Sequence, residues 1–209
     1  MKTPRLLSLF AILPVTGWAQ PLTFGFQGGA PAQTPLGRAN TNMPFTLGPT
    51  VTVGVFSGLS LESGVLFHRL GDTSDNFGVQ YPENAFTFGA HQWRGRAIEL
   101  PFVLKYRFLS ERRTWQPFLS AGPTVRRTSI NFTSLSTIFS GSQLSPFDNR
   151  PFTDEKSVKW NVDPVVGAGL SFRTGRFYVE PEVRYSYWGA GKNSVVRKNQ
   201  VHLLFGFRF

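Results

Sequence analysis

Three histidines and several carboxylates are the residues of this chain that could support catalysis. His202 lies close to the end of the chain, and Ser186 and Glu182 belong to the stretch that precedes it. An imidazole beside a hydroxyl and an acid can take the hydroxyl proton and so create a nucleophile. Any inward-facing polar position would also tolerate a histidine, so we expect His202 to be structural and predict no catalytic residue.

Other chemistry finds less support in the residues. Glu180 and Glu182 share one strand face, but inward acids of this kind usually pair with inward bases. The acids Asp72, Asp75 and Glu83 lack the spacing of a metal-binding loop, and the absence of cysteine excludes disulfides and thiolate metal sites. We therefore predict no metal site and no cofactor.

The first residues are typical of an exported protein. Lys2 and Arg5 precede the apolar segment 6–15, and the small residues Gly17 and Ala19 suit a signal peptidase, so residues 1–19 are predicted to be a cleavable signal peptide. Its removal leaves 20 basic residues against 12 acidic ones. These charges are scattered and form no single stripe, so we expect no nucleic-acid partner.

The stretch Val201 to Phe209 organises the predicted fold. Because side chains alternate across a strand, Leu203, Phe205, Phe207 and Phe209 share one wholly apolar face with Val201. No stretch after the signal has the unbroken apolar length of a membrane helix, so insertion into a membrane would require strands that close into a barrel.

Seven further stretches show a similar alternation and are predicted strands: 22–26, 45–56, 59–68, 93–108, 116–132, 159–173 and 177–188. Long segments at 29–44, 69–92, 131–158 and 189–199 are predicted loops, and they alternate with short turns at 57–58, 110–115 and 174–176. This asymmetry is typical of outer-membrane barrels, with short turns in the periplasm and long loops outside. A soluble sandwich or lipocalin-like cup would share the strand alternation but not the loop asymmetry.

Several segments resemble a known family. The stretches IELPFVLKYRF (98–108) and PFLSAGPTVR (117–126), together with the terminal Phe209, are similar to the bacterial outer-membrane protein β-barrel domain family, the small eight-stranded OmpA/OmpX-like or PorT-like barrels. The resemblance implies an all-β, eight-stranded antiparallel up-and-down transmembrane β-barrel over residues 20–209, integral to the outer membrane and monomeric. It also implies that Phe209 is an assembly signal for the barrel-assembly machinery. Lipid A deacylases of this size carry a His and Ser motif that is missing after His202.

Strand parity directs nine charged residues into the lumen: Glu62, Glu99, Lys105, Arg107, Asp163, Glu180, Glu182, Arg184 and Arg208. An eight-stranded interior is just wide enough for side chains to fill, so we expect opposite charges to pair and close the lumen. Arg126 and Arg173 are further candidate partners. The face of Arg126 stays open, because Pro117 and Pro123 blur the alternation of its strand.

A second group of bases is predicted to lie in outer loops or at outer strand ends: Arg38, Arg69, Arg94, Arg96, Arg150, Lys156, Lys159, Lys192, Arg197 and Lys198. Arg94, Arg96 and Lys159 are the candidate contacts to lipopolysaccharide phosphates, although these charges could equally serve solubility. The sequence favours a non-enzymatic barrel acting in envelope structure or surface interaction through its loops, whose ligands it does not identify. A lipid A deacylase or a small pore is the alternative.

Overall fold

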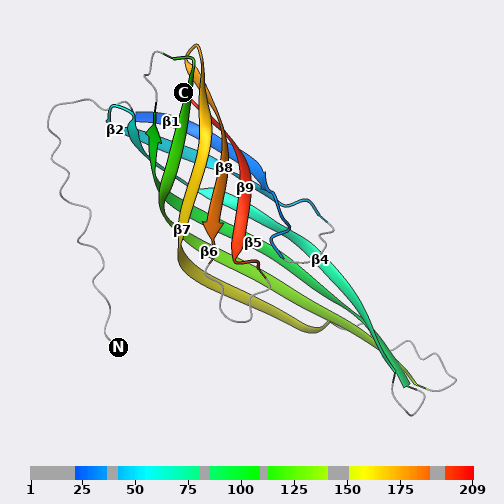
Figure 1. The fold of residues 1–209 in the computed structure, drawn as a ribbon. Coiled ribbons are helices and arrows are strands. Elements are labelled where there is room, and N and C mark those ends of the chain that lie inside the picture. Colours follow the sequence, from blue (N-terminus) through cyan, green and yellow to red (C-terminus); the bar gives the residue numbers. More distant parts are fainter. Residues whose placement is uncertain (1–21, 37–41, 81–84, 109–112, 141–150, 189–195) are drawn as a thin grey trace, which may run out of the picture.

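The computed structural model describes residues 22–36, 42–80, 85–108, 113–140, 151–188 and 196–209, and it is all-β within these ranges (Figure 1). Its strands are β1 (Leu22–Pro31), β2 (Phe45–Phe56), β3 (Leu59–Gly64), β4 (Leu66–Gln80), β5 (Ala85–Arg107), β6 (Trp115–Ser140), β7 (Pro151–Thr174), β8 (Phe177–Tyr187) and β9 (Asn199–Arg208). The described residues include no helix with the length and apolar character needed to cross a membrane. The predicted signal peptide, residues 1–19, lies outside the described residues.

One antiparallel sheet closes on itself to form a barrel. Strands β3 and β4 each pair with β2 and β5, the other strands pair with their neighbours in chain order, and β1 pairs with both β2 and β9. Phe24 and Phe209 exchange backbone hydrogen bonds at 2.9 and 3.2 Å, which join the first strand to the end of the last one. The predicted up-and-down barrel topology is confirmed.

The nine strand segments make eight strands of the barrel, because β3 and β4 are two parts of one continuous strand. Their register against β2 does not shift, since Thr50 faces Gly64 and Leu47 faces Phe67. The break falls at Val65, whose amide donates to the carbonyl of Pro49 at 3.1 Å. Proline has no N–H to return to the ladder, so the assigned strand is interrupted there without a change of direction.

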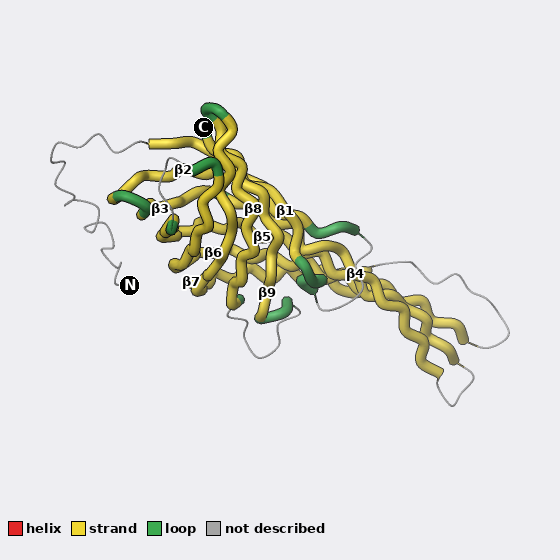
Figure 2. The backbone as a smooth tube through the Cα atoms, turned by 45° about the horizontal axis from the view of Figure 1, so that its top comes forward, coloured by secondary structure: helices red, strands yellow, loops and turns green. Residues whose placement is uncertain are grey.

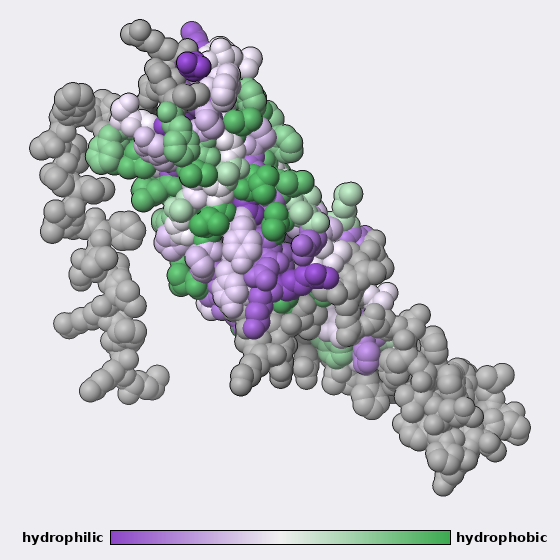
Figure 3. Space-filling view, in the orientation of Figure 1, coloured by the Kyte–Doolittle hydropathy of each residue, from purple (hydrophilic) through white to green (hydrophobic). Residues whose placement is uncertain are grey.

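The two faces of the barrel differ in polarity as the alternation predicts. On β9, Leu203, Phe205 and Phe207 are 50–55% exposed, whereas His202 and Leu204, which alternate with them, are 4% and 2% exposed. Hydrophobic side chains gather over the barrel strands, and hydrophilic ones lie where these strands pass into a projecting arm (Figure 3). An apolar outer surface of this kind is suited to lipid.

The projecting arm corrects two predicted loops. Strands β4 to β7 extend well beyond the barrel (Figure 2), with β4 continuing to Gln80, β5 starting at Ala85, β6 continuing to Ser140 and β7 starting at Pro151. The predicted loops 69–92 and 131–158 were therefore wrong over most of their length. Backbone pairing, such as Gln80 with Phe86 and Phe132 with Glu155, holds these polar strands together without apolar alternation.

The opposite end of the barrel has short connections, and the first and last described residues, Leu22 and Phe209, lie there. Gly58 and Gly175 sit in two of the turns with φ of 78° and 63°, a conformation that glycine adopts without steric cost. We call this the short-turn end. The other end, from which the arm projects, is the arm end.

Candidate functional site

The structure places all nine predicted lumen charges on the inner face of the barrel, where they are buried or half-buried. Strand β8 supplies Glu180, Glu182 and Arg184 on alternate positions, and β5 supplies Glu99, Lys105 and Arg107 in the same way. The side chains form two ionic clusters, one towards the short-turn end and one towards the arm end.

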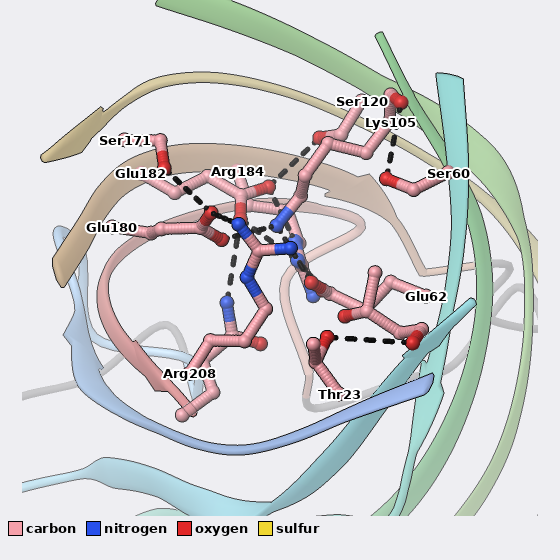
Figure 4. A network of polar contacts seen from close by, with 12 residues as sticks. Thr23, Ser60, Glu62, Lys105, Ser120, Ser171, Glu180, Glu182, Arg184 and Arg208 are labelled. Carbon is pink, nitrogen blue, oxygen red and sulfur yellow. Dashed lines mark hydrogen bonds and ion pairs between the residues drawn. The ribbon is translucent and has the colours of Figure 1, made fainter. Parts of the chain in front are cut away.

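The short-turn cluster is centred on Glu180, whose carboxylate is 4–5% exposed. Lys105 Nζ lies 3.0 Å from Glu180 Oε2 and 2.6 Å from Glu62 Oε2. Arg107 and Arg208 both direct Nη2 at Glu180 Oε1, at 3.1 and 3.3 Å. Figure 4 shows Glu62, Lys105, Glu180 and Arg208 pointing toward one another inside the ring of strands. One carboxylate thus holds three cations.

Arg184 extends this cluster toward the middle of the barrel. Its Nη2 lies 2.9 Å from Glu182 Oε2 and 3.2 Å from Glu62 Oε1, and its Nε donates to Glu182 at 2.9 Å. Ser120 also donates to Glu182, at 2.8 Å. Residues on β3, β6 and β8 therefore meet across the lumen.

The arm-end cluster is built around Arg126, which is fully buried. Arg126 lies 2.8 Å from Glu99 Oε2 and 2.8 Å from Asp163 Oδ2, and the ring of Trp188 lies 3.7 Å from its guanidinium carbon. His68 Nε2 approaches the same oxygen of Glu99 at 3.1 Å. Arg126 was not among the nine residues predicted for the lumen. Its register position directly opposite Glu99 is the signal that could have assigned it.

The other candidate partner, Arg173, does not enter the lumen. It is exposed, and its Nε donates to the carbonyl of Gly175 in the neighbouring turn.

Arg126 completes a balance of charge in the described lumen. Five carboxylates, Glu62, Glu99, Asp163, Glu180 and Glu182, meet five bases, Lys105, Arg107, Arg126, Arg184 and Arg208. Each of these carboxylates lies within 3.3 Å of at least one base. The many charges of the interior therefore add up to a net formal charge of zero when its histidines are neutral.

A hydrophobic plug covers the arm-end cluster. Leu36, Leu70, Ala97, Trp188 and Val196 form one buried group, with Ile130 packed against it. A β-bulge at Leu70, between Arg69 and Gly71, allows that side chain to join the plug. The cavity beside Lys105 and Glu180 measures only about 10 Å³, roughly the space of one water molecule.

The residues considered for catalysis are engaged elsewhere. Ser186 accepts a hydrogen bond from Trp188 Nε1 at 2.9 Å, and Glu182 binds Arg184. His202 is buried, with its Nδ1 3.5 Å from Thr46 Oγ1 and its ring 5.5 Å from that of His68. In the described part of the chain, no group of three or more His, Asp or Glu side chains could hold a metal ion.

The predicted lipopolysaccharide contacts fall on two different faces. Arg94 and Arg96 are exposed and share the outward face of β5. Lys159 is also exposed, but its strand position matches that of inward-facing Asp163. Arg127, which the sequence reasoning missed, lies outward beside Trp160.

Strand register places five bases in one outward group, which we call the basic rim patch: Arg69, Arg94, Arg96, Arg127 and Lys156. Asp72 partly neutralises it, at 3.4 Å from Arg69 and 4.0 Å from Arg94. Arg197 and Lys198 are exposed near the plug, whereas Arg38, Arg150 and Lys192 lie outside the described residues. The patch adjoins outward Phe67, Ile98 and Trp160, so its charges lie at the border of the apolar surface.

Comparison with known proteins identifies a family. The model of the outer membrane protein beta-barrel domain matches residues 18–189. A search of curated protein sequences finds no match.

Three solved structures are similar to the chain. The N-terminal β-barrel domain of OprF from Pseudomonas aeruginosa is 14% identical, with a TM-score of 0.47, over 90% of this chain and 96% of that one. Neisserial surface protein A is 17% identical, with a TM-score of 0.48, over 90% and 94%. Ail, the attachment invasion locus protein of Yersinia pestis, is 10% identical, with a TM-score of 0.36, over 90% and 96%.

Proposed function

Because the chain belongs to the outer membrane protein β-barrel domain family, we propose that it is a non-enzymatic, monomeric barrel exported by a signal peptide at 1–19. Its short-turn end faces the periplasm, and its arm and loops act outside the cell in envelope structure or surface interaction. The single observation that carries this proposal is the lumen, where five acids pair with five bases beneath a hydrophobic plug. Such an interior leaves the two ends and the outer surface for function.

Two alternatives find less support. A deacylase would need His202 to take the proton of the Ser186 hydroxyl, but the hydroxyl that lies 3.5 Å from His202 Nδ1 is that of Thr46. A pore would need a continuous aqueous path, and the ion pairs together with the plug oppose one.

Cysteine labelling tests the placement of the two ends, because the natural chain has no cysteine. Ser74→Cys lies exposed in the arm, and Arg176→Cys lies exposed in a short turn. A membrane-impermeant maleimide applied to intact cells should label the first variant and not the second. After permeabilisation it should label both. Labelling of Arg176→Cys but not Ser74→Cys on intact cells would reverse the proposed orientation.

We also propose that the basic rim patch binds the phosphates of lipopolysaccharide. Bases next to an apolar belt meet anionic head groups, and each is worth about 1 kcal/mol near a charged membrane surface. Arg96, Arg127 and Lys156 are suitable for a test, because Asp72 approaches the other two members of the patch.

The test compares two triple variants that remove the same charge. Replacing Arg96, Arg127 and Lys156 by glutamine should weaken lipopolysaccharide binding to the barrel in nanodiscs by roughly a hundredfold, from about 3 kcal/mol. The control replaces Arg113, Arg173 and Arg176, which are exposed at the short-turn end. Equal losses in both variants would show a general charge effect and exclude the patch, as would no loss in either.

A further inference from the structure

A second cavity opens at the short-turn end and plays no part in the function proposed above. It measures about 160 Å³ and is lined by side chains of β1, β2, β3, β5, β6, β8 and β9. We call it the vestibule. Its polar lining includes Ser60, Arg107, Gln116, Tyr178 and Arg208.

The two arginines of the vestibule are held in place from different sides. Arg107 Nη1 donates to Ser60 Oγ at 3.0 Å, and its Nη2 donates to Glu180 at 3.1 Å. The guanidinium carbon of Arg208 lies 4.2 Å from the centre of the Tyr178 ring. Both side chains are therefore preorganised, so the binding of a ligand would cost little side-chain entropy.

These arginines also share a single carboxylate. Both Nη2 atoms approach Glu180 Oε1, which accepts a further hydrogen bond from Ser171 at 2.9 Å, while Lys105 binds the other oxygen. A guanidinium carries five N–H donors, and the Nε atoms of Arg107 and Arg208 have no partner among the described residues. The donors of this pair thus exceed the acceptors that Glu180 offers.

The charges of the lumen, although balanced as a whole, are divided unevenly between its ends. The short-turn cluster holds the bases Lys105, Arg107, Arg184 and Arg208 against the acids Glu62, Glu180 and Glu182. The arm-end cluster holds two acids, Glu99 and Asp163, against Arg126 when His68 is neutral. One positive charge is left over at the short-turn end, where the vestibule lies.

We propose that the vestibule is an anion-binding site that takes one small oxyanion, a carboxylate or a phosphate, beside Arg107 and Arg208. Such a group would match the spare charge and would accept from the guanidinium donors that Glu180 leaves unused. The enclosed volume suits a compact anion rather than a polymer. The site does not depend on which side of the membrane the short-turn end faces.

Titration calorimetry on the refolded full-length barrel in zwitterionic detergent, at constant sodium chloride, tests this site. Inorganic phosphate and acetate serve as separate probes, and the one that binds more tightly identifies the preferred oxyanion. Arg208→Gln should weaken binding roughly tenfold to a hundredfold, the range for losing one charge-assisted interaction. Arg208 is the first choice because Glu180 keeps Lys105, Arg107 and Ser171 in its absence.

Arg173→Gln is the matched control. Arg173 is an exposed arginine at the same end, and its Nε binds the carbonyl of Gly175. Its replacement should leave the affinity unchanged. Arg107→Gln is the second vestibule variant, and all proteins are first checked for folding by heat-modifiable migration. The site is supported if the wild-type protein binds the anion saturably and the affinity falls in folded Arg208→Gln, in folded Arg107→Gln or in both, but not in Arg173→Gln. Absence of binding, or equal binding in the vestibule variants and the control, would overturn it.

Discussion

Replacing Glu180 by glutamine is the most direct test of how the lumen is held together. Glu180 is 4% exposed and lies within 3.3 Å of Lys105, Arg107 and Arg208. Glutamine has nearly the same volume, so the change removes a charge with little change in packing. Three cations would then lose the carboxylate they share, and Glu62 would remain the nearest acid to Lys105.

The expected cost follows from the geometry. Removing one partner of a buried ion pair typically costs about 3–5 kcal/mol, because the other charge is left without compensation. This range applies to Lys105, which is 1% exposed, because water cannot replace the lost carboxylate there. Arg107 and Arg208 line the 160 Å³ vestibule, where water can solvate part of their charge, so we expect the lower part of the range. Equilibrium unfolding in denaturant, followed by tryptophan fluorescence in lipid vesicles, measures the loss.

A double-mutant cycle separates this electrostatic cost from other effects. Lys105→Gln combined with Glu180→Gln restores the charge difference of the short-turn cluster, so the double variant should be more stable than the sum of the single losses implies. Residues within one ionic network typically couple by about 0.5–3 kcal/mol. The exposed Arg173→Gln variant is the control and should change stability by less than about 1 kcal/mol. A similarly small loss in Glu180→Gln, or strictly additive losses in the cycle, would refute the network as a source of stability.

Two further predictions concern assembly and conductance. Phe209 is 63% exposed and closes the barrel through backbone bonds with Phe24, so Phe209→Glu should lower the folded yield in the outer membrane, whereas Phe209→Tyr should not. Heat-modifiable migration on gels measures both, and an unchanged yield in Phe209→Glu would contradict an assembly role. Planar-bilayer recordings of the intact protein should show no large steady conductance, because ion pairs and the plug fill the lumen. A stable, porin-like conductance would restore the pore hypothesis.

For strands that lie between lipid and the lumen, the side chains that point inward and those that point outward could be predicted from the sequence. The parity that directed Glu180, Glu182 and Arg184 inward follows from the two-residue period of a strand. On the barrel part of β5 the same reasoning placed Glu99 and Lys105 inside and Phe102 and Leu104 outside, as the structure does. An apolar surface on one face and paired charges on the other leave little freedom in such a pattern.

The arm could not be predicted in this way, because both of its faces lie beyond the apolar belt. Residues such as Asn131 and Lys156 pair through their backbones, and no alternation of polarity accompanies that pairing.

Prolines concealed other features. Pro49 divides one strand of the barrel into β3 and β4. Pro117 and Pro123 blur the alternation of their strand, so the sequence did not show whether Arg126 points inward or outward.

The inward position of Arg126, which the sequence left open, changes the electrostatic picture of the whole interior. The nine residues predicted from the sequence include five acids and four bases, which would leave an unpaired carboxylate in a dry lumen. Such a charge would be costly, so the prediction itself implied a missing base. Arg126 supplies it between Glu99 and Asp163, at the far end from the vestibule. The balance is therefore achieved over the length of the barrel and not within each cluster, and the positive remainder at the short-turn end follows from where Arg126 sits.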